Sequence, residues 1–201
     1  MVRAFLDKVN MALTPSTMLP LGTKAPDFTL VDVVSQTTIN LSNYASPKGL
    51  LIIFLCCHCP FVKHVETEIA KLSQDYQEQG IGIIAISVND ITKYPDDAPD
   101  KLKNMAQRLG FNFAVCFDES QTVAKAYQAA CTPDFFLFNA AKELVYRGQL
   151  DDSRPGNNSP VTGKDLRAAI EALITGKPIN PEQKPSIGCN IKWKPGNEPS
   201  Y

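Results

Sequence analysis

The sequence lacks a long apolar run and lacks an excess of charge of either sign. Its longest apolar stretch, residues 50–57, is well short of the roughly 18 apolar residues that cross a bilayer. The 20 basic and 21 acidic residues nearly cancel, leaving a formal net charge of −1. We therefore expect neither a membrane nor nucleic acid as a partner, because no long-range field attracts the chain to an anionic surface.

The sequence also lacks an export signal. Its first 20 residues contain Arg3, Asp7 and Lys8 among scattered apolar residues, without a continuous apolar segment and a small-residue cleavage site. We therefore expect a soluble, cytoplasmic protein. Internal repeats and low-complexity tracts are missing as well, and a chain of 201 residues, 44% hydrophobic and 20% charged, is typical of one globular domain.

Strand-like and helix-like segments alternate along the chain. An apolar run at residues 50–55 precedes apolar residues at helical spacing over 60–76, and a second apolar run follows at 81–87. This order predicts a βαβ unit. The remaining patterns predict an α/β fold with a central mixed sheet flanked by helices: helices at 99–109, 121–130 and 164–174, a strand at 113–117, and a hairpin of 135–138 with 143–149.

The end of the chain differs from its centre. Apolar periodicity stops at Gly176, and five prolines follow between residues 178 and 199. We predict three parts: an N-terminal extension (1–20), one domain (21–175) and an extended, Pro-rich tail (176–201). Cys189 and Trp193 favour docking of the tail on the domain.

Three of the six cysteines, Cys56, Cys57 and Cys59, lie within four residues, unlike the spread framework of a small secreted domain. They stand where a predicted strand turns into a helix. This predicts Cys56 in the N-cap region, where unpaired backbone N–H groups and the helix dipole favour a thiolate. Cys59 lies within reach of that sulfur, and Pro60 suits a helix start. We predict that Cys56 is the nucleophile and that Cys59 resolves its disulfide.

His58 can stabilise the Cys56 thiolate through charge or a hydrogen bond, which makes it a third catalytic candidate. The alternative is a solvated histidine in a turn. We expect His64 to lie at the surface and Lys63 to be solvated rather than catalytic.

Zinc is an alternative use of the same motif, with His58 or Cys57 as a further ligand. A zinc site usually needs a second ligand pair at tight spacing, which Cys116, Cys131 and Cys189 do not offer. We therefore predict no metal and no other cofactor. Inert buried thiols are the remaining alternative, and Cys116, in a strand-like run, is expected in the core.

Several segments together resemble the redoxin branch of the thioredoxin superfamily, which includes AhpC/TSA-type peroxiredoxins and thioredoxin-like disulfide oxidoreductases. Residues 25–30 (Ala-Pro-Asp-Phe-Thr-Leu) resemble its opening strand, and residues 131–136 (Cys-Thr-Pro-Asp-Phe-Phe) resemble its cis-proline segment. The resemblance extends to a thioredoxin-like subgroup with a Cys-x-His-Cys-Pro motif and with segments like 146–152 and 187–194. It implies a thioredoxin-like fold with a redoxin extension at the N-terminus.

The resemblance also implies roles for residues outside the motif. Pro133 would be cis and face the cysteine pair, and the backbone of Thr132 would bind a substrate strand by edge pairing. Cys131 would lie near the pair, although a buried core thiol needs no function. Cys189 becomes a distant resolving thiol if the tail folds back, but we expect it to be unpaired and solvated. Cys57, Cys131 and Cys189 are thus candidate auxiliary thiols.

The function that we predict is thiol–disulfide exchange through a mixed disulfide. The substrates would be protein or small-molecule disulfides, and the electron donor a thiol such as thioredoxin or glutathione. The alternative is an antioxidant, peroxiredoxin-like thiol peroxidase. Its Pro-x-x-x-Thr/Ser-x-x-Cys motif falls on Ile52, Cys56 and Cys59, which makes Cys59 (or Cys56) peroxidatic, but the proline and the hydroxyl are missing. A redox-sensing or metal-holding binding module is a further, non-enzymatic alternative.

Overall fold

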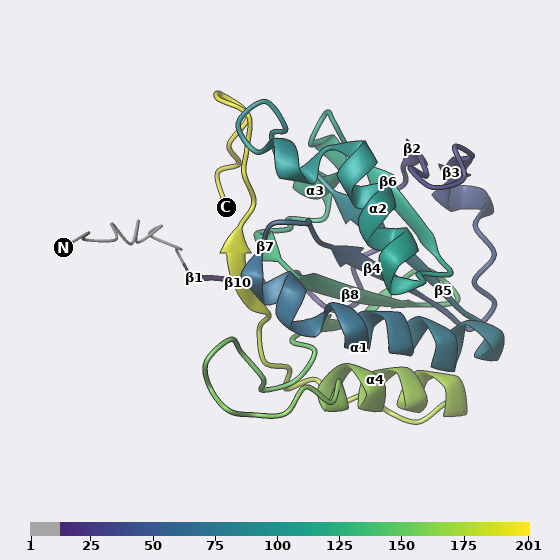
Figure 1. Ribbon diagram of the computed structural model, residues 1–201. Coiled ribbons are helices and arrows are strands. Elements are labelled where there is room, and N and C mark those ends of the chain that lie inside the picture. Colours follow the sequence, from purple (N-terminus) through teal and green to yellow (C-terminus); the bar gives the residue numbers. More distant parts are fainter. Residues whose placement is uncertain (1–12) are drawn as a thin grey trace.

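A five-stranded mixed sheet forms the centre of the protein (Figure 1). The computed structural model describes residues 13–201, so the first 12 residues of the predicted extension, with Arg3, Asp7 and Lys8, lie outside the described residues. The strand order is β6-β5-β4-β8-β9, with β4, β5 and β6 parallel and with β8 and β9 joined as an antiparallel hairpin. The bounds are β4 Gly49–Phe54, β5 Ile81–Ser87, β6 Ala114–Phe117, β8 Asp134–Asn139 and β9 Leu144–Gly148. The predicted α/β class, βαβ unit and hairpin are confirmed.

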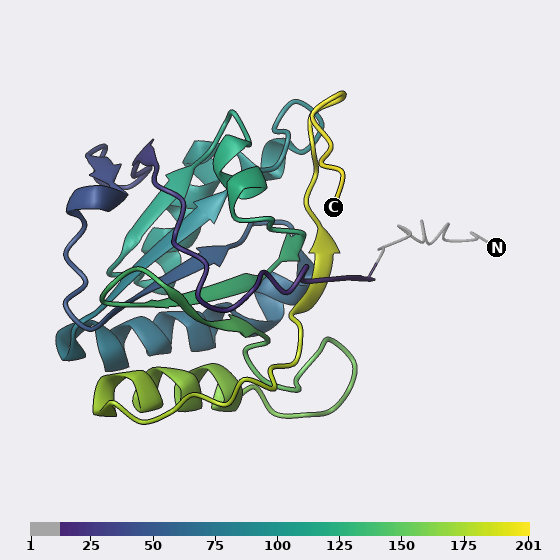
Figure 2. The ribbon, with the colours of Figure 1, turned by 180° about the vertical axis from the view of Figure 1, so that it is seen from behind.

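Among the described residues, four α-helices accompany the sheet: α1 (Pro60–Tyr76), α2 (Pro99–Leu109), α3 (Thr122–Ala126) and α4 (Lys164–Thr175). Figures 1 and 2 show α1 and α4 side by side along one face. The helix predicted over 121–130 is shorter, because Gln128 has a φ of 50°, a left-handed conformation that an α-helix cannot continue through. No helix within residues 13–201 is both long and apolar enough to span a bilayer.

The central strand β4 is buried on both faces. Leu51 and Ile53 join a cluster that α1, α2 and α4 cover, whereas Leu50 and Ile52 join a second cluster around Tyr127. Side chains of a strand alternate between the two faces of the sheet, so a strand covered on both sides is apolar at every position. This explains the continuous apolar run from which the strand was predicted.

The tail of the chain is part of the fold. Strand β10 (Ile187–Asn190) lies between β1 (Leu13–Pro15) and β7 (Cys131–Thr132) in a second, three-stranded sheet. Figure 1 shows β10 in yellow beside the N-terminal end of α1. Ile191 is buried and Trp193 packs against the second cluster. Docking of the tail is confirmed, and the three predicted boundaries stay predictions.

The remaining elements are short. Strands β2 (Thr29–Val31) and β3 (Thr38–Asn40) form an antiparallel pair. The part of the chain that the structure describes also has three single 3-10 turns: η1 (Leu41–Asn43), η2 (Gln77–Gln79) and η3 (Pro95–Asp97). The last of these turns, η3, carries a buried aspartate to the cysteine motif.

Candidate active site

The helix that follows the cysteine motif begins later than predicted. Helix α1 starts at Pro60, and its N-cap is Cys59, with φ −65° and ψ 122°. The prediction that Cys56 occupies the N-cap was wrong. Proline at the first helical position sets the start of the helix, and residues 55–58 form the turn between strand and helix. The helix dipole therefore acts most directly on Cys59.

Three sulfur atoms meet beside this helix start. The Sγ of Cys59 lies 2.9 Å from the Sγ of Cys189 and 3.2 Å from the carbonyl oxygen of Thr132. The Sγ of Cys56 lies 3.5 Å from the Oγ1 of the same Thr132. The residues Cys56, Cys59 and Cys189 are 1%, 0% and 5% exposed. The expectation of a solvated Cys189 was wrong, because pairing of β10 with β7 carries this sulfur inside.

The sulfurs differ in acidity because they share hydrogen bonds. Bonds from Cys189 and Cys56 hold the pKa of the Cys59 thiol well below its usual range, and a bond from the Val62 backbone N–H adds to them. The hydrogen bond to Cys59, followed by burial, raises the pKa of Cys56, and the same two causes raise that of Cys189. Such groups titrate as one unit. We assign the negative charge of the reduced cluster to Cys59.

A buried carboxylate organises the turn. Oδ1 of Asp97 accepts hydrogen bonds from the backbone N–H groups of Cys57 (2.8 Å) and His58 (3.1 Å). Its Oδ2 lies 2.5 Å from Nδ1 of His58 and accepts a bond from Nδ2 of Asn89 at 2.8 Å. Burial raises the pKa of Asp97, but the bonds from His58 and Asn89 outweigh it and hold that pKa below its ordinary value. Asp97 therefore fixes the turn as a carboxylate.

The contact with Asp97 determines which ring nitrogen of His58 carries a hydrogen and how the ring is oriented. An ionised carboxylate only accepts hydrogen bonds, so Nδ1 of His58 must carry a hydrogen. The ring stacks on Tyr94 with centroids 5.4 Å apart, and Nδ1 lies 3.9 Å from the Sγ of Cys56. His58 thus stands beside Cys56 in a fixed orientation, rather than as an unattached turn histidine, and its catalytic role stays a prediction.

Asp97 and Asn89 were missed from the sequence. They follow β5, which lies next to β4 and runs parallel to it. The carboxyl ends of parallel strands meet at one edge of a sheet, and polar residues after neighbouring strands can share a site there. That weak signal was present in the sequence, but nothing local pairs residue 97 with residue 58.

The predicted substrate-binding segment is filled by the chain itself. The Thr132–Pro133 peptide bond is cis, as the resemblance implies. Thr132 pairs with Cys189, and Cys131 pairs with Asn190, so β10 occupies the edge. Binding of a substrate strand by Thr132 and Pro133 stays a prediction, and it requires β10 to leave that edge.

The remaining predicted residues lie around the site. Cys131 is buried with its Sγ 3.7 Å from the carbonyl oxygen of Pro133. Cys57 is half-buried, and burial, followed by the charge of Asp97, raises its pKa to about 12, so it stays a thiol. Cys116 is a core residue, as predicted. His64 is partly exposed, and its Nε2 lies 2.7 Å from the Oγ of Ser153.

One set of side chains could hold a metal ion. Single ligand atoms of Cys56, His58 and Asp97 lie within 4.8 Å of one another. In the structure, however, Nδ1 of His58 and Oδ2 of Asp97 bond each other at 2.5 Å, and a metal would have to break that bond. The set suits hydrogen bonding better than metal binding.

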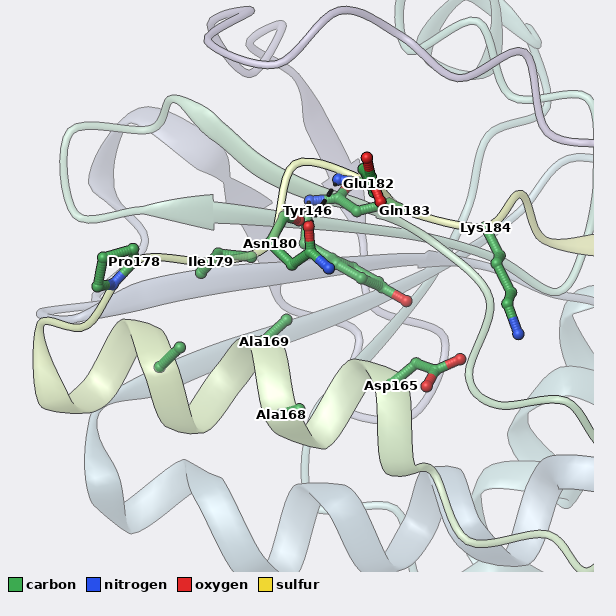
Figure 3. Close-up of a pocket in the computed structure, with 11 residues that line it drawn as sticks. Tyr146, Asp165, Ala168, Ala169, Pro178, Ile179, Asn180, Glu182, Gln183 and Lys184 are labelled. Carbon is green, nitrogen blue, oxygen red and sulfur yellow. Dashed lines mark hydrogen bonds between the residues drawn. The ribbon is translucent and has the colours of Figure 1, made fainter.

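A cavity of about 460 Å³ lies between α4 and residues 178–184 (Figure 3). The ring of Tyr146 reaches into it, and the small side chain of Ala169 on α4 leaves it open. Its lining, as far as the chain is described, includes no sulfur atom. This cavity is therefore not where thiol chemistry takes place.

Comparisons with known proteins place this geometry in context. The model of the AhpC/TSA family matches residues 21–147. Thiol-disulfide oxidoreductase ResA of Geobacillus kaustophilus (strain HTA426) is 28% identical over 131 residues, 65% of this chain and 70% of that protein. The chloroplastic 2-Cys peroxiredoxin BAS1 of Hordeum vulgare is 26% identical over 188 residues, 90% of this chain and 85% of that protein. These two relatives represent both of the enzyme classes predicted from the sequence.

Solved structures agree on the fold. The crystal structure of an uncharacterized conserved protein from Geobacillus kaustophilus is 50% identical, with a TM-score of 0.90 over 92% of this chain and 98% of that one. A thiol:disulfide interchange protein of the thioredoxin family from Chlorobium tepidum TLS is 15% identical, with a TM-score of 0.59 over 78% of this chain and 99% of that one. The fold is thioredoxin-like, and the chain belongs to the AhpC/TSA family.

Proposed function

We propose that this protein is a thiol–disulfide oxidoreductase whose reacting couple is Cys56 and Cys59. The observation that carries the proposal is the position of Cys59 at the N-cap of α1, where hydrogen bonds from neighbouring sulfurs favour its thiolate. A cysteine whose pKa is lowered at a helix N-terminus is typical of disulfide oxidoreductases. The relatives named as thiol-disulfide oxidoreductases support the same class of reaction.

The two cysteines have different tasks in the proposed reaction. Cys56 borders His58, whose side chain is 25% exposed, whereas Cys59 is enclosed by Cys189 and Thr132. We therefore assign to Cys56 the attack on the substrate disulfide, as predicted from the sequence. Passing its proton to the Cys59 thiolate makes Cys56 the nucleophile.

The exchange then follows two displacements. The Cys56 thiolate attacks one sulfur of a substrate disulfide, forms a mixed disulfide and releases the other sulfur as a thiolate. Cys59 gives the proton that it took from Cys56 to the released substrate thiolate. Its own thiolate then attacks Cys56, forms the Cys56–Cys59 disulfide and releases the second substrate sulfur as a thiolate. Two electrons have moved to the substrate. A thiol donor such as thioredoxin or glutathione then reduces the Cys56–Cys59 disulfide.

Trapping experiments test the proposal. Wild-type protein should reduce insulin disulfides in the presence of a thiol reductant, and both Cys56→Ser and Cys59→Ser should abolish turnover. Cys59→Ser should accumulate a mixed disulfide at Cys56, identified by mass spectrometry. Cys116→Ser, which changes a buried thiol in β6, is the matched control and should retain turnover.

Some outcomes would contradict the assignment. An adduct on Cys57 of the Cys59→Ser variant would show that Cys57, and not Cys56, is the nucleophile. A full equivalent of zinc, lost from Cys59→Ser, would favour a metal-holding module instead.

A second candidate is a peroxiredoxin-like peroxidase with Cys59 as the peroxidatic thiol. It is favoured by the N-cap position of Cys59 directly before Pro60, and by the similarity to a 2-Cys peroxiredoxin. Cys56 would then resolve the sulfenic acid. Measuring hydrogen peroxide consumption and insulin reduction with the same reductant separates the two functions. Fast peroxide consumption without disulfide turnover would replace the first proposal by the second.

We further propose that the protein works in a reducing compartment, the cytoplasm. The support is the use of its cysteines, which cluster in a helix-start motif instead of forming a spread framework of crosslinks. Cell fractionation with thiol labelling tests this, and recovery of the protein outside the cytoplasm would overturn it.

A further inference from the structure

We propose that Cys189 is a third redox-active cysteine. It attacks Cys59 in the Cys56–Cys59 disulfide and forms a Cys59–Cys189 disulfide, which links the tail strand β10 covalently to the active site. The inference rests on the proposed function and extends it by a further reacting residue and by control of the Thr132 edge. It is carried by the contact of the two sulfur atoms and by the way in which β10 is held.

The sulfur atoms of Cys59 and Cys189 are in direct contact. The Sγ atoms of Cys59 and Cys189 are 2.9 Å apart, compared with about 2.05 Å in a disulfide. Both residues are buried, at 0% and 5% exposure. Water and external thiols are therefore kept from this pair, whereas each sulfur has the other within reach.

The position of Cys189 is fixed on both sides of its strand. Within β10, it pairs with Leu13 of β1 and with Thr132 of β7. Gly188 makes the approach possible, because a Cβ atom built there would lie 2.0 Å from the carbonyl oxygen of Thr132. A larger residue would push β10, and the sulfur with it, away from the active site.

Further bonds hold the chain beyond β10. The backbone N–H of Ile191 donates to the carbonyl oxygen of Ala130 at 3.1 Å, and that of Lys192 donates to Oδ1 of Asn89 at 2.8 Å. Asn89 is also a partner of Asp97, the carboxylate that fixes the Cys57–His58 turn. The tail strand and the cysteine motif are therefore held by one connected set of hydrogen bonds.

The reaction needs no external oxidant. The thiolate of Cys189 attacks Cys59 in the Cys56–Cys59 disulfide, so a bond forms between Cys59 and Cys189 while the bond between Cys59 and Cys56 breaks. Cys189 loses a proton, and Cys56 leaves as a thiolate that takes one up. The number of disulfides is unchanged, and the exchange is reversible.

The exchange changes what the site presents. With Cys59 bound to Cys189, β10 cannot leave Thr132, so the edge predicted to bind substrate is closed and Cys56 is a free thiol. With Cys56 bound to Cys59, β10 is held by noncovalent contacts alone and can be displaced. Access to the edge would thus depend on which two of the three sulfurs are bonded.

Disulfide mapping of the full-length protein tests the inference. Native protein is oxidised with limiting diamide, alkylated under denaturing conditions, and digested with trypsin. Cys56 and Cys59 share one tryptic peptide and Cys189 lies on another, so the proposed bond joins two peptides. Wild type should yield both the Cys56–Cys59 loop and the joined peptides. Cys56→Ser should yield no joined peptides, because the Cys56–Cys59 disulfide that Cys189 attacks cannot form, and Cys189→Ser should yield the loop alone.

The outcomes separate this inference from the proposed function. Turnover and a Cys56–Cys59 loop without joined peptides in wild type overturn the role of Cys189 and leave the enzyme intact. Joined peptides that persist in Cys59→Ser also overturn it. A wild type that forms neither bond overturns both proposals. Cys116→Ser, which changes a buried thiol in β6, is the control and should keep the joined peptides. Mapping in wild type does not depend on any variant folding.

Discussion

At the scale of single residues, the site depends on two buried side chains that carry charge. Cys59 holds its charge because other groups donate hydrogen bonds to its sulfur, and Asp97 because it receives bonds from a turn and from two side chains. Buried charges are tolerated when they are paired and hydrogen-bonded. Removing a partner of either group should therefore change a measurable pKa or the stability of the fold.

The acidity of Cys59 can be observed directly. At about pH 7, below the ordinary thiol pKa of about 8.5, reduced wild type should show one thiolate in its ultraviolet absorbance, and Cys59→Ser should show none. Cys189→Ser should raise the pKa of the remaining Cys59, because the hydrogen bond from Cys189 is the largest cause of its lowering. Cys116→Ser should titrate like wild type. A thiolate that survives in Cys59→Ser would contradict the assignment of the charge.

Asp97→Asn should destabilise the protein in a pH-dependent way. The variant replaces an acceptor by a donor facing Nδ1 of His58, so we expect the free energy of unfolding at neutral pH to fall by about 2–3 kcal/mol. The pKa of Asp97 is lower in the folded state than its ordinary value. Its stabilisation is therefore present above that value and is lost as the pH falls through the folded pKa.

Urea unfolding at several pH values measures this effect. The difference between wild type and Asp97→Asn should be largest near neutral pH and should shrink below about pH 4. Asp96→Asn, the neighbouring position, is the matched control, since Asp96 is exposed. A difference that stays constant down to strongly acidic pH would rule out the charge of Asp97 as its cause.

At the scale of elements, the start of α1 and the docking of β10 together build the site. Pro60 places the N-cap on Cys59, and β10 brings Cys189 to it from 130 residues away along the chain. Because β10 approaches β7 closely at Gly188, the docking of β10 is sensitive to the size of the side chain at that position.

Gly188→Ala should loosen β10 from the Thr132 edge. The added Cβ meets a backbone carbonyl, which cannot move aside as a flexible side chain can. Overpacking of this kind costs about 1–3 kcal/mol, which corresponds to labelling of Cys189 by a thiol reagent at least about fivefold faster than in wild type. Asn190→Ala, an exposed position in the same strand, should leave the labelling rate unchanged. Equal rates in Gly188→Ala and wild type would contradict the tight approach.

At the scale of the whole molecule, the tail completes the second core cluster as well as the active site. Ile191 is 1% exposed and lies in the cluster around Tyr127, to which β4 also contributes. The tail is thus part of the structure that holds the sheet, and it does not behave as a separate appendage of the domain predicted over 21–175.

Ile191→Ala should therefore lower global stability. Removing a buried isoleucine side chain costs about 2–5 kcal/mol, from lost apolar burial and from the cavity left behind. Chemical unfolding followed by fluorescence and by circular dichroism should show one transition, shifted to lower denaturant. Glu198→Ala, exposed in the same tail, should unfold like wild type. An unchanged midpoint for Ile191→Ala would mean that the tail is not part of the cooperative unit.

Local sequence patterns were enough to predict the layers of the fold and to identify the cysteine motif. The run at residues 50–55 is apolar throughout because β4 is covered on both faces, and the spacing of Cys56 and Cys59 before a helix places both sulfurs at its start. These features follow from local periodicity and from short-range chain geometry. They could be predicted because neighbouring residues carry them.

The groups that surround that motif depend on contacts between distant parts of the chain. Residues 58 and 97 meet because β4 and β5 are adjacent, and residues 59 and 189 meet because β10 pairs with β7. The N-cap of α1 is Cys59 and not the predicted Cys56, and hydrogen bonds lower the pKa of the Cys59 thiol. Long-range strand pairing leaves no periodic mark on the sequence, and the acidity of a buried sulfur depends on the partners that such pairing brings to it.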